Sequence, residues 1–473
     1  MPPTRNRRGD RDKTRRPGGP RRTGRPQDLV RRTAFDVIRA VETRDAYANL
    51  LLPSRLRDRG LTGRDAALAT ELTYGTLRGR GTYDAVLALC SDRELRRIDA
   101  PLLDVLRLGA HQILGTRIPP HAAVGTAVEL ARSVSGPGQA KFANAVLRKV
   151  AGRDLDAWLA IVAPPDADTT TRLSIAHSHP KWIVSALRDA LGPDRDEIDA
   201  LLAADNARPL VTLVARPGRA TLEELYEAGA EPAPYSPYAA VLSEGDPAGV
   251  AAVRDGRAAV QDEASQMVAL ALTAAPLDGR DSRWADLCAG PGGKAGLLSA
   301  LATERGARLL ASDVQPHRAG LVVHAVDDQS GIIAADGTVP AWRPGAFDRV
   351  IVDAPCTGLG ALRRRPEARW RRGPGSVAEL GSLQRKLLTN ALDSVRPGGV
   401  VAYVTCSPHL AETRVVVDDV LRARQDVERL DSPAVLASVA PDLTGLGEGP
   451  YAQFWPHRHG TDAMFLALLR RTD

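Results

Sequence analysis

The chain contains 473 residues, which is too many for a single hydrophobic core and predicts two to four domains. It has no run of eighteen apolar residues and no apolar signal segment at its N-terminus, so we expect a cytoplasmic protein without a membrane span. The four cysteines are scattered and form no C-x-x-C pair, so we expect neither a disulfide framework nor a metal.

The formal net charge of +6 is concentrated at one end of the chain. Residues 1–32 carry 12 Lys and Arg against 3 Asp, a net charge of +9, so the remainder sums to −3. This segment is rich in Pro and Gly, and we expect residues 1–25 to be a disordered basic tail. Such a tail suits electrostatic binding of nucleic acid, but a solvated tail without a specific role fits equally well.

Helical periodicity predicts an all-α domain over residues 26–160. Apolar residues recur at helical spacing, between glycine and proline breaks, over 28–41, 64–78, 82–90, 101–114, 121–133 and 141–150. Helices in this number and order form an independent bundle. The histidines His111 and His121 stand alone in the sequence, and we interpret both as structural.

The next segment, residues 172–260, is predicted to be a small α+β module that packs on the C-terminal domain. A linker begins at Ala163, and Pro180 opens a helix, a position where proline is compatible with the first turn. An apolar run over 210–215 reads as a strand, and 222–228 reads as a helix.

Residues 261–473 are predicted to form a doubly wound α/β domain, because strand and helix patterns alternate from about residue 283. The first strand, 283–287, runs into a glycine-rich turn whose residues are Cys288, Ala289, Gly290, Pro291, Gly292, Gly293 and Lys294. Such a turn lets the backbone approach a cofactor at the start of the following helix. The spacing is neither a P-loop nor a dinucleotide fingerprint, so we assign Lys294 no phosphate role.

Three later strands end in an aspartate. Asp313 is placed to hold ribose hydroxyls, and Asp336 to receive an amino group on an adenine ring. Asp353 ends the apolar run of residues 350–352. A single aspartate at a strand end is more often a turn former, but three in succession favour a cleft for a nucleoside cofactor.

Two predicted strands end close to a cysteine: Cys356 follows Asp353, and Cys406 follows the run of residues 400–404. With one helix between them, these strands would lie side by side in a doubly wound sheet, and both thiols would face one cleft. The alternative is that both are small buried core residues.

A basic run follows the first of these cysteines. Arginine side chains there could contact phosphates and a tryptophan could stack on a base; the residues are Arg363, Arg364, Arg365, Arg369, Trp370, Arg371 and Arg372. The alternative interpretation is an ordinary solvated charge run.

Sequence motifs add a resemblance to these patterns. The segments RDAALATELTYGTLR, PLLDVLRLGAHQILG and KFANAVLRKV resemble the NusB-like RNA-binding bundle, in which Arg78, Arg80 and Arg148 are either phosphate contacts or solvated residues. The motifs DLCAGPGGK, DAPCTGLGALRRRPEARW and VTCSPHLAE resemble the signature motifs of RNA (cytosine-5)-methyltransferases. From about residue 26 to 470 the chain resembles the bacterial Sun/Fmu-type 16S ribosomal RNA (cytosine-5)-methyltransferases.

The resemblance implies a Rossmann-like S-adenosylmethionine-dependent methyltransferase domain behind the NusB-like bundle and the small α+β module. It implies that S-adenosylmethionine binds along Cys288–Lys294 with Asp313, Asp336 and Asp353. It further implies that Cys406 adds to carbon 6 of cytosine, that Asp353 donates to ring nitrogen 3, and that Cys356 assists proton removal and thiol release. Three positions depart from the family pattern: Ala295 for Thr, Thr413 for Asn and Ala463 for Gly.

The resemblance implies 16S ribosomal RNA as the partner of a protein that we expect to be a monomer. Two alternatives remain open: a transfer RNA (cytosine-5)-methyltransferase, and a non-catalytic RNA-binding assembly factor with the same fold. The motifs do not reveal which cytosine is modified, or whether free RNA or a ribosomal subunit is the substrate.

Overall fold

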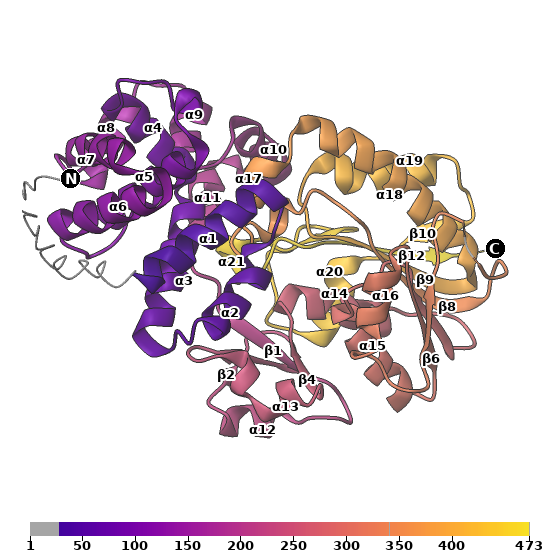
Figure 1. Cartoon of the computed structure of the whole chain (residues 1–473). Coiled ribbons are helices and arrows are strands. Elements are labelled where there is room, and N and C mark those ends of the chain that lie inside the picture. The colour runs from indigo at the N-terminus through magenta and orange to yellow at the C-terminus, as the bar shows by residue number, and fades with distance from the viewer. Residues whose placement is uncertain (1–27, 340, 473) are drawn as a thin grey trace, which may run out of the picture.

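The computed structural model describes residues 28–339 and 341–472, so the predicted basic tail of residues 1–25 lies outside the described residues. A helical N-terminal part is followed by a small antiparallel sheet and then by a large sheet with helices on both faces (Figure 1). None of the described helices combines the length and the apolar character that a membrane crossing requires.

The N-terminal part is helical, as predicted, and one core joins its helices. In α1, the buried positions Ala34, Val37, Ile38 and Val41 recur every three or four residues and face this core. The helices are α1 (Leu29–Arg44), α2 (Ala48–Asp58), α3 (Gly63–Arg78), α4 (Arg80–Cys90), η1 (Leu95–Arg97), α5 (Ala100–Leu114), α6 (Pro120–Ser135), α7 (Pro137–Val150) and α8 (Leu155–Val162).

Helix α2 is absent from the predicted elements. It contains Pro53 in its interior, a residue that usually breaks a helix, and it buries only Ala48 and Leu52. Its sequence therefore carries little of the periodicity on which the other helices were predicted.

The predicted module of residues 172–260 consists of two parts with separate cores. Its helical part packs against apolar residues of the C-terminal domain, among them Leu359, Leu362 and Trp455. The elements of this part are α9 (Thr169–Ala176), α10 (Lys181–Leu191), η2 (Gly192–Glu197) and α11 (Ile198–Asn206). The sheet part has its own core, and its strand order is β2 (Glu231–Pro232), β3 (Ala239–Leu242), β1 (Val211–Ala215), β4 (Ala258–Val260), with α12 (Leu222–Glu227), η3 (Pro247–Gly249) and α13 (Ala251–Arg254).

The C-terminal domain is built on a mixed sheet. Strands β5 to β9 pair in parallel, whereas β12 is antiparallel to β9 and β10. The order is β10 (Val427–Arg429), β12 (Phe465–Arg471), β9 (Val395–Thr405), β8 (Phe347–Asp353), β5 (Arg283–Asp286), β6 (Arg308–Asp313), β7 (Gly331–Ala334), and β11 (Ala452–Gln453) pairs with β12.

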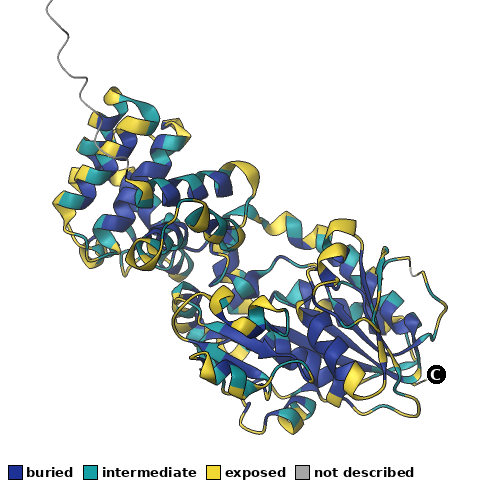
Figure 2. Cartoon of the chain, turned by 60° about the horizontal axis from the view of Figure 1, so that its bottom comes forward, coloured by how far each residue is buried: buried dark blue, intermediate teal, exposed yellow. Residues whose placement is uncertain are grey.

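Both faces of this sheet are covered, and successive strand residues alternate between two cores. The strands and the helix faces packed against them are buried (Figure 2). Ile351 packs with one set of helices, while its neighbours Val350 and Val352 pack with the other. The first set contains α14 (Glu263–Ala274), α15 (Gly293–Glu304), α16 (Pro316–Val322) and α20 (Ser432–Val439). The second contains α18 (Pro374–Ser394) and α19 (Arg414–Arg422). The predicted doubly wound domain is therefore confirmed.

The topology fixes where a ligand can bind. After β7 at one edge, the chain returns to β8 on the opposite side of β5, so β5 lies at the point where the strand order reverses. In open α/β sheets, the crevice at the carboxyl ends of the strands beside such a switch point is the ligand site. The short elements η4 (Leu359–Ala361), α17 (Ala368–Arg371), η5 (Leu410–Glu412) and α21 (Pro456–His459) also belong to this domain.

Candidate active site

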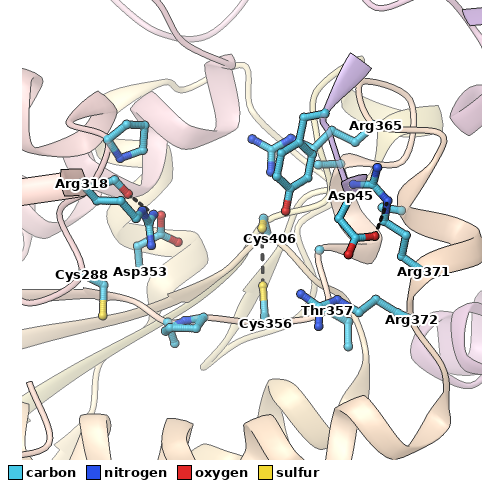
Figure 3. Close-up of a pocket in the computed structure, with 18 residues that line it drawn as sticks. Asp45, Cys288, Arg318, Asp353, Cys356, Thr357, Arg365, Arg371, Arg372 and Cys406 are labelled. Carbon is cyan, nitrogen blue, oxygen red and sulfur yellow. Dashed lines mark hydrogen bonds and ion pairs between the residues drawn. The ribbon is translucent and has the colours of Figure 1, made fainter. Parts of the chain in front are cut away.

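A cavity of about 510 Å³ lies at the carboxyl ends of β5, β8 and β9 (Figure 3). Cys288, Asp353, Cys356 and Cys406 all line it, so several predicted site residues meet in one place. Its volume is in the range of small-molecule sites, about 300–1,000 Å³. Among residues 28–339 and 341–472, no group of His, Cys, Asp or Glu side chains is arranged to hold a metal ion.

The two thiols face each other across neighbouring strands. Strands β8 and β9 pair in parallel with Asp353 opposite Val404, and each strand runs on into a loop that carries one cysteine. The sulfur atoms of Cys356 and Cys406 lie 3.4 Å apart (Figure 3). The prediction that adjacent strands bring both thiols to one cleft is confirmed.

A buried glutamate ties the two cysteine loops together. Glu412 accepts a hydrogen bond from the backbone N–H of Thr357, at 2.8 Å, and another from the hydroxyl of the same residue. It also accepts from the hydroxyl of Ser407 at 2.6 Å. Thr357 follows Cys356 and Ser407 follows Cys406, so a single fully buried carboxylate fixes the backbone beside both thiols.

Lys294 extends from the first turn of α15 to Asp353, with a distance of 2.7 Å between Nζ and Oδ2. Burial alone would lower the pKa of Lys294, but the charge of Asp353 and the hydrogen bond outweigh it and raise that pKa. The charge interaction with Cys406 also raises the pKa of Lys294. The lysine therefore places a positive charge beside the carboxylate and the thiols, a pairing that the sequence did not reveal.

The glycine turn after β5 lies flat against the end of β6. The N–H of Gly290 donates to Asp313 at 3.1 Å, and a Cβ on Gly290 would lie 2.6 Å from that carboxylate oxygen. Gly292 has a φ of +117°, and its Cβ would lie 2.7 Å from the side chain of Ala325. Around Gly293 a Cβ would meet nothing within 4 Å, so the turn leaves its backbone open to a ligand at the start of α15.

Asp286, which the sequence analysis did not single out, lies beneath this turn at the end of β5. It is buried, and no described residue bonds its Oδ2 atom. Burial and the neighbouring charge of Asp353 raise the pKa of Asp286 to about 7. An unpartnered buried acceptor beside an open glycine turn suits the ammonium group of S-adenosylmethionine. Its position at a strand end, the signal that identified Asp313 and Asp353, could have identified it.

Of the remaining residues predicted to bind the cofactor, some line the cavity and others do not. Cys288 and Pro291 line the cavity, and burial raises the pKa of the Cys288 thiol. Ala289 is buried behind them. Asp336 is exposed after β7, does not line the cavity, and accepts hydrogen bonds from the N–H and hydroxyl of Thr338 at 2.8 and 2.7 Å.

The basic run after Cys356 divides into residues that bond within the protein and residues that line the cavity. Arg363 and Arg364 both pair with the half-buried Asp262 and the buried Asp462, at 2.7–3.1 Å. Arg363 is buried by this pairing, and the guanidinium groups are occupied because the two carboxylates need compensating charge.

Arg369 and Trp370 are also engaged inside the protein. Arg369 is fully buried and donates to the carbonyls of Arg78, Ser178 and Asp205 and to the side chain of Asn206, so it cannot contact a phosphate. The guanidinium of Arg80 lies over the Trp370 ring, 5.4 Å from the ring centroid. This contact covers one stacking face of the ring and engages the cation of Arg80. Three members of the run do line the cavity, namely Arg365, Arg371 and Arg372.

The sequence and the fold are similar to those of known proteins. The 16S rRNA methyltransferase RsmB/F model matches residues 272–470, and the NusB family model matches residues 29–152. Mycobacterium tuberculosis Rv1407, whose name gives it only as a methyltransferase, is 54% identical over 462 residues, covering 97% of this chain and 99% of that protein. The ribosomal RNA small subunit methyltransferase B of Pseudomonas putida is 32% identical over 459 residues, covering 93% of this chain and 98% of that protein. The crystal structure of PH0851 shares the fold, with a TM-score of 0.76, 22% identity and coverage of 94% and 99%.

The doubly wound sheet, its glycine turn and its strand-end acids define an S-adenosylmethionine-dependent methyltransferase. The chain belongs to the RsmB/F family of 16S rRNA methyltransferases, with a NusB-family domain on its N-terminal side, and it is an RNA methyltransferase. The predicted family, the fold class and the methyl donor are thereby confirmed.

Proposed function

We propose that the protein transfers a methyl group to carbon 5 of a cytosine in 16S ribosomal RNA, through a covalent bond between Cys406 and carbon 6 of the base. The observation that carries this proposal is the pair of sulfur atoms 3.4 Å apart, beside Asp353 and the glycine turn. Carbon 5 of cytosine is a weak nucleophile, and addition of a thiolate at carbon 6 makes it enamine-like. S-adenosylmethionine supplies the electrophilic methyl group.

The tendency of Cys356 to keep its proton supports Cys406 as the nucleophile. The hydrogen bond to Cys406, together with burial, raises the pKa of Cys356 well above its ordinary value. Either sulfur atom can be the donor in the contact between the two thiols, and the raised pKa of Cys356 favours Cys356 as the donor toward Cys406. A hydrogen bond to a thiolate favours that charged form, and the thiolate is the form that attacks.

The ion pair of Lys294 and Asp353 supports stabilisation of the base during this attack. Electron density moves to ring nitrogen 3 as the sulfur adds to carbon 6, so a proton or a strong hydrogen bond is needed there. Lys294 donates to Asp353 at 2.7 Å and holds this carboxyl group beside the thiols. When Asp353 carries a proton, it can donate that proton to ring nitrogen 3, and the ammonium group of Lys294 compensates the carboxylate that is left.

Cys356 is then the group in position to complete the reaction. Its raised pKa results first from the hydrogen bond with Cys406. Once Cys406 is bonded to carbon, that effect is lost, and Cys356 can release its proton to solvent and act as a base. Removal of the carbon 5 proton by Cys356 re-forms the ring double bond, and Cys406 leaves as a thiolate.

The family and the arginine side chains at the cavity both support RNA as the substrate. A base enters such a pocket from a single strand or by extrusion from a helix, which costs a few kcal/mol. The cations of Arg365, Arg371 and Arg372 at the cavity suit the flanking phosphates. The match to the NusB family favours ribosomal over transfer RNA.

The deciding experiment is transfer of labelled methyl groups to unmodified small-subunit RNA and, separately, to unmodified transfer RNA. We expect label in small-subunit RNA alone, at a cytosine that becomes resistant to bisulfite. Label in transfer RNA would support the alternative substrate. Absence of label in both would refute the proposal and leave an RNA-binding assembly factor.

A further inference from the structure

One wall of the catalytic cavity comes from the N-terminal bundle. Asp45 and Tyr47, in the turn between α1 and α2, line the same cavity as Cys356 and Cys406. Figure 3 shows Asp45 beside Arg371, across the cavity from Asp353 and Arg318. Residues of the N-terminal bundle therefore line the catalytic cavity itself.

The turn is fixed to the segment that follows Cys356. Arg371 donates to the carbonyl of Val41 at 3.1 Å and to that of Ala46. The N–H of Ala48 donates to Oε1 of Glu367 at 3.1 Å, and Glu367 is buried. These bonds bracket Tyr47 on both sides, so its backbone position is set by the catalytic domain.

The Tyr47 ring holds two of the arginines that line the cavity. The guanidinium of Arg365 lies over this ring at 5.0 Å and that of Arg371 at 5.2 Å. Arg365 is exposed and forms no ion pair with an acidic side chain among the described residues, unlike Arg363 and Arg364. The tyrosine ring thus orders Arg365 without neutralising its charge, whereas Arg371 also lies 3.9 Å from the carboxylate of Asp45.

We propose that Tyr47 is a positioning residue for RNA, which holds Arg365 at the mouth of the cavity, beside the anchored Arg371, to bind a phosphate flanking the target nucleotide. A pre-ordered guanidinium loses less entropy on binding, whereas a carboxylate partner would compete with the phosphate. This inference rests on the proposed function for the identity of the occupant as an RNA nucleotide. It assigns the bundle a direct part in recognising the target.

The test compares three variants of the full chain, Tyr47→Phe, Tyr47→Leu and Leu50→Ala, in equilibrium binding to a small-subunit RNA fragment. Phenylalanine keeps the π face that attracts both guanidiniums, whereas leucine keeps apolar bulk without it. Leu50 is 68% exposed on α2 and does not line the cavity, so it serves as the matched control.

We expect Tyr47→Leu to weaken RNA binding about 2- to 5-fold, which corresponds to the cation–π interaction with Arg365 at the strength typical of exposed sites. The dependence of binding on salt should flatten in the same variant, while affinity for S-adenosylmethionine stays unchanged. Tyr47→Phe and Leu50→Ala should bind RNA like the wild type. In a double-mutant cycle, Tyr47→Leu and Arg365→Ala should be non-additive.

Wild-type binding by Tyr47→Leu, an equal loss in Tyr47→Phe, or additivity with Arg365→Ala would each overturn the inference. Binding is measured without turnover, so these outcomes are independent of methylation. Failure of the wild type to methylate RNA would refute the proposed function instead, and the binding comparison would still decide the role of Tyr47.

Discussion

Glu412 holds Thr357 at two points, because its carboxylate accepts from both the backbone N–H and the hydroxyl of the threonine. Ser407 donates to the same carboxylate from the other cysteine loop. The 3.4 Å separation of the two sulfur atoms is therefore maintained by a group that does not touch the substrate.

Glu412→Gln should lower kcat about 100-fold, because one of the two acceptor oxygens becomes an NH2 group that cannot accept from the donors on the cysteine loops, and displacement of about 1 Å costs this much. Affinity for S-adenosylmethionine should not change, which steady-state kinetics together with calorimetry would establish. The control is Glu379→Gln, an exposed position on α18. Unaltered kcat in Glu412→Gln would mean that the loops hold their geometry without the carboxylate.

Substitution of the two cysteines should separate their roles. Cys406→Ala should abolish turnover and leave no covalent complex, because the nucleophile is gone. Cys356→Ala should accumulate protein cross-linked to RNA, because addition and methylation proceed while release fails. Denaturing gels with labelled RNA distinguish the two results, and a reversed pattern would show that the thiols have the opposite assignment.

Neutralising the arginines at the cavity should weaken RNA binding, whereas the same change far from it should not. For the pair Arg365→Ala and Arg372→Ala, we expect the slope of log K against log salt to fall by about 0.7 for each single-strand phosphate that the variant no longer binds. Arg308→Ala is the control, because Arg308 is exposed at the amino end of β6, away from the cavity. An unchanged slope in the double variant would exclude phosphate binding by these two side chains.

A buried acid between α11 and the catalytic domain should make stability depend on pH. Burial raises the pKa of Asp205 to about 7, against the opposing charges of Arg369 and Arg363, and His179 lies 3.6 Å away. An unfolded aspartate titrates near about 3.9. The folded form therefore binds more protons between these values, and the contribution of Asp205 to stability is lost as pH rises from about 4 through 7.

Asp205→Asn isolates this effect, because His179, whose pKa burial lowers, titrates in the opposite sense in both proteins. We expect the unfolding free energy of the wild type, relative to Asp205→Asn, to fall between pH 5 and pH 8 in denaturant titrations. The exposed Asp196→Asn should show a constant difference over the same range. Parallel curves for Asp205→Asn would show that its carboxyl group does not titrate in this window.

Much of the fold and the central pair of thiols could be predicted from the sequence, because buried parallel strands leave a continuous apolar signal. Strands β8 and β9 each show such a run, and their adjacency follows from the helical crossover that connects them. Which arginines are buried and which line the cavity could not be predicted, because Arg369 and Arg372 belong to the same basic run in the sequence. Tyr47 was missed because its place depends on how the bundle docks.

Arg369 joins the N-terminal bundle and the connecting helices to the catalytic domain. Its cation is compensated by carbonyl oxygens from α3 and from the α9–α11 segment, while the residue itself belongs to the loop that carries Cys356. A buried guanidinium deprived of such acceptors is strongly destabilising. A chimera that exchanges the bundle between relatives will therefore fold only if the end of its α3 presents a carbonyl oxygen to this arginine, as Arg78 does here.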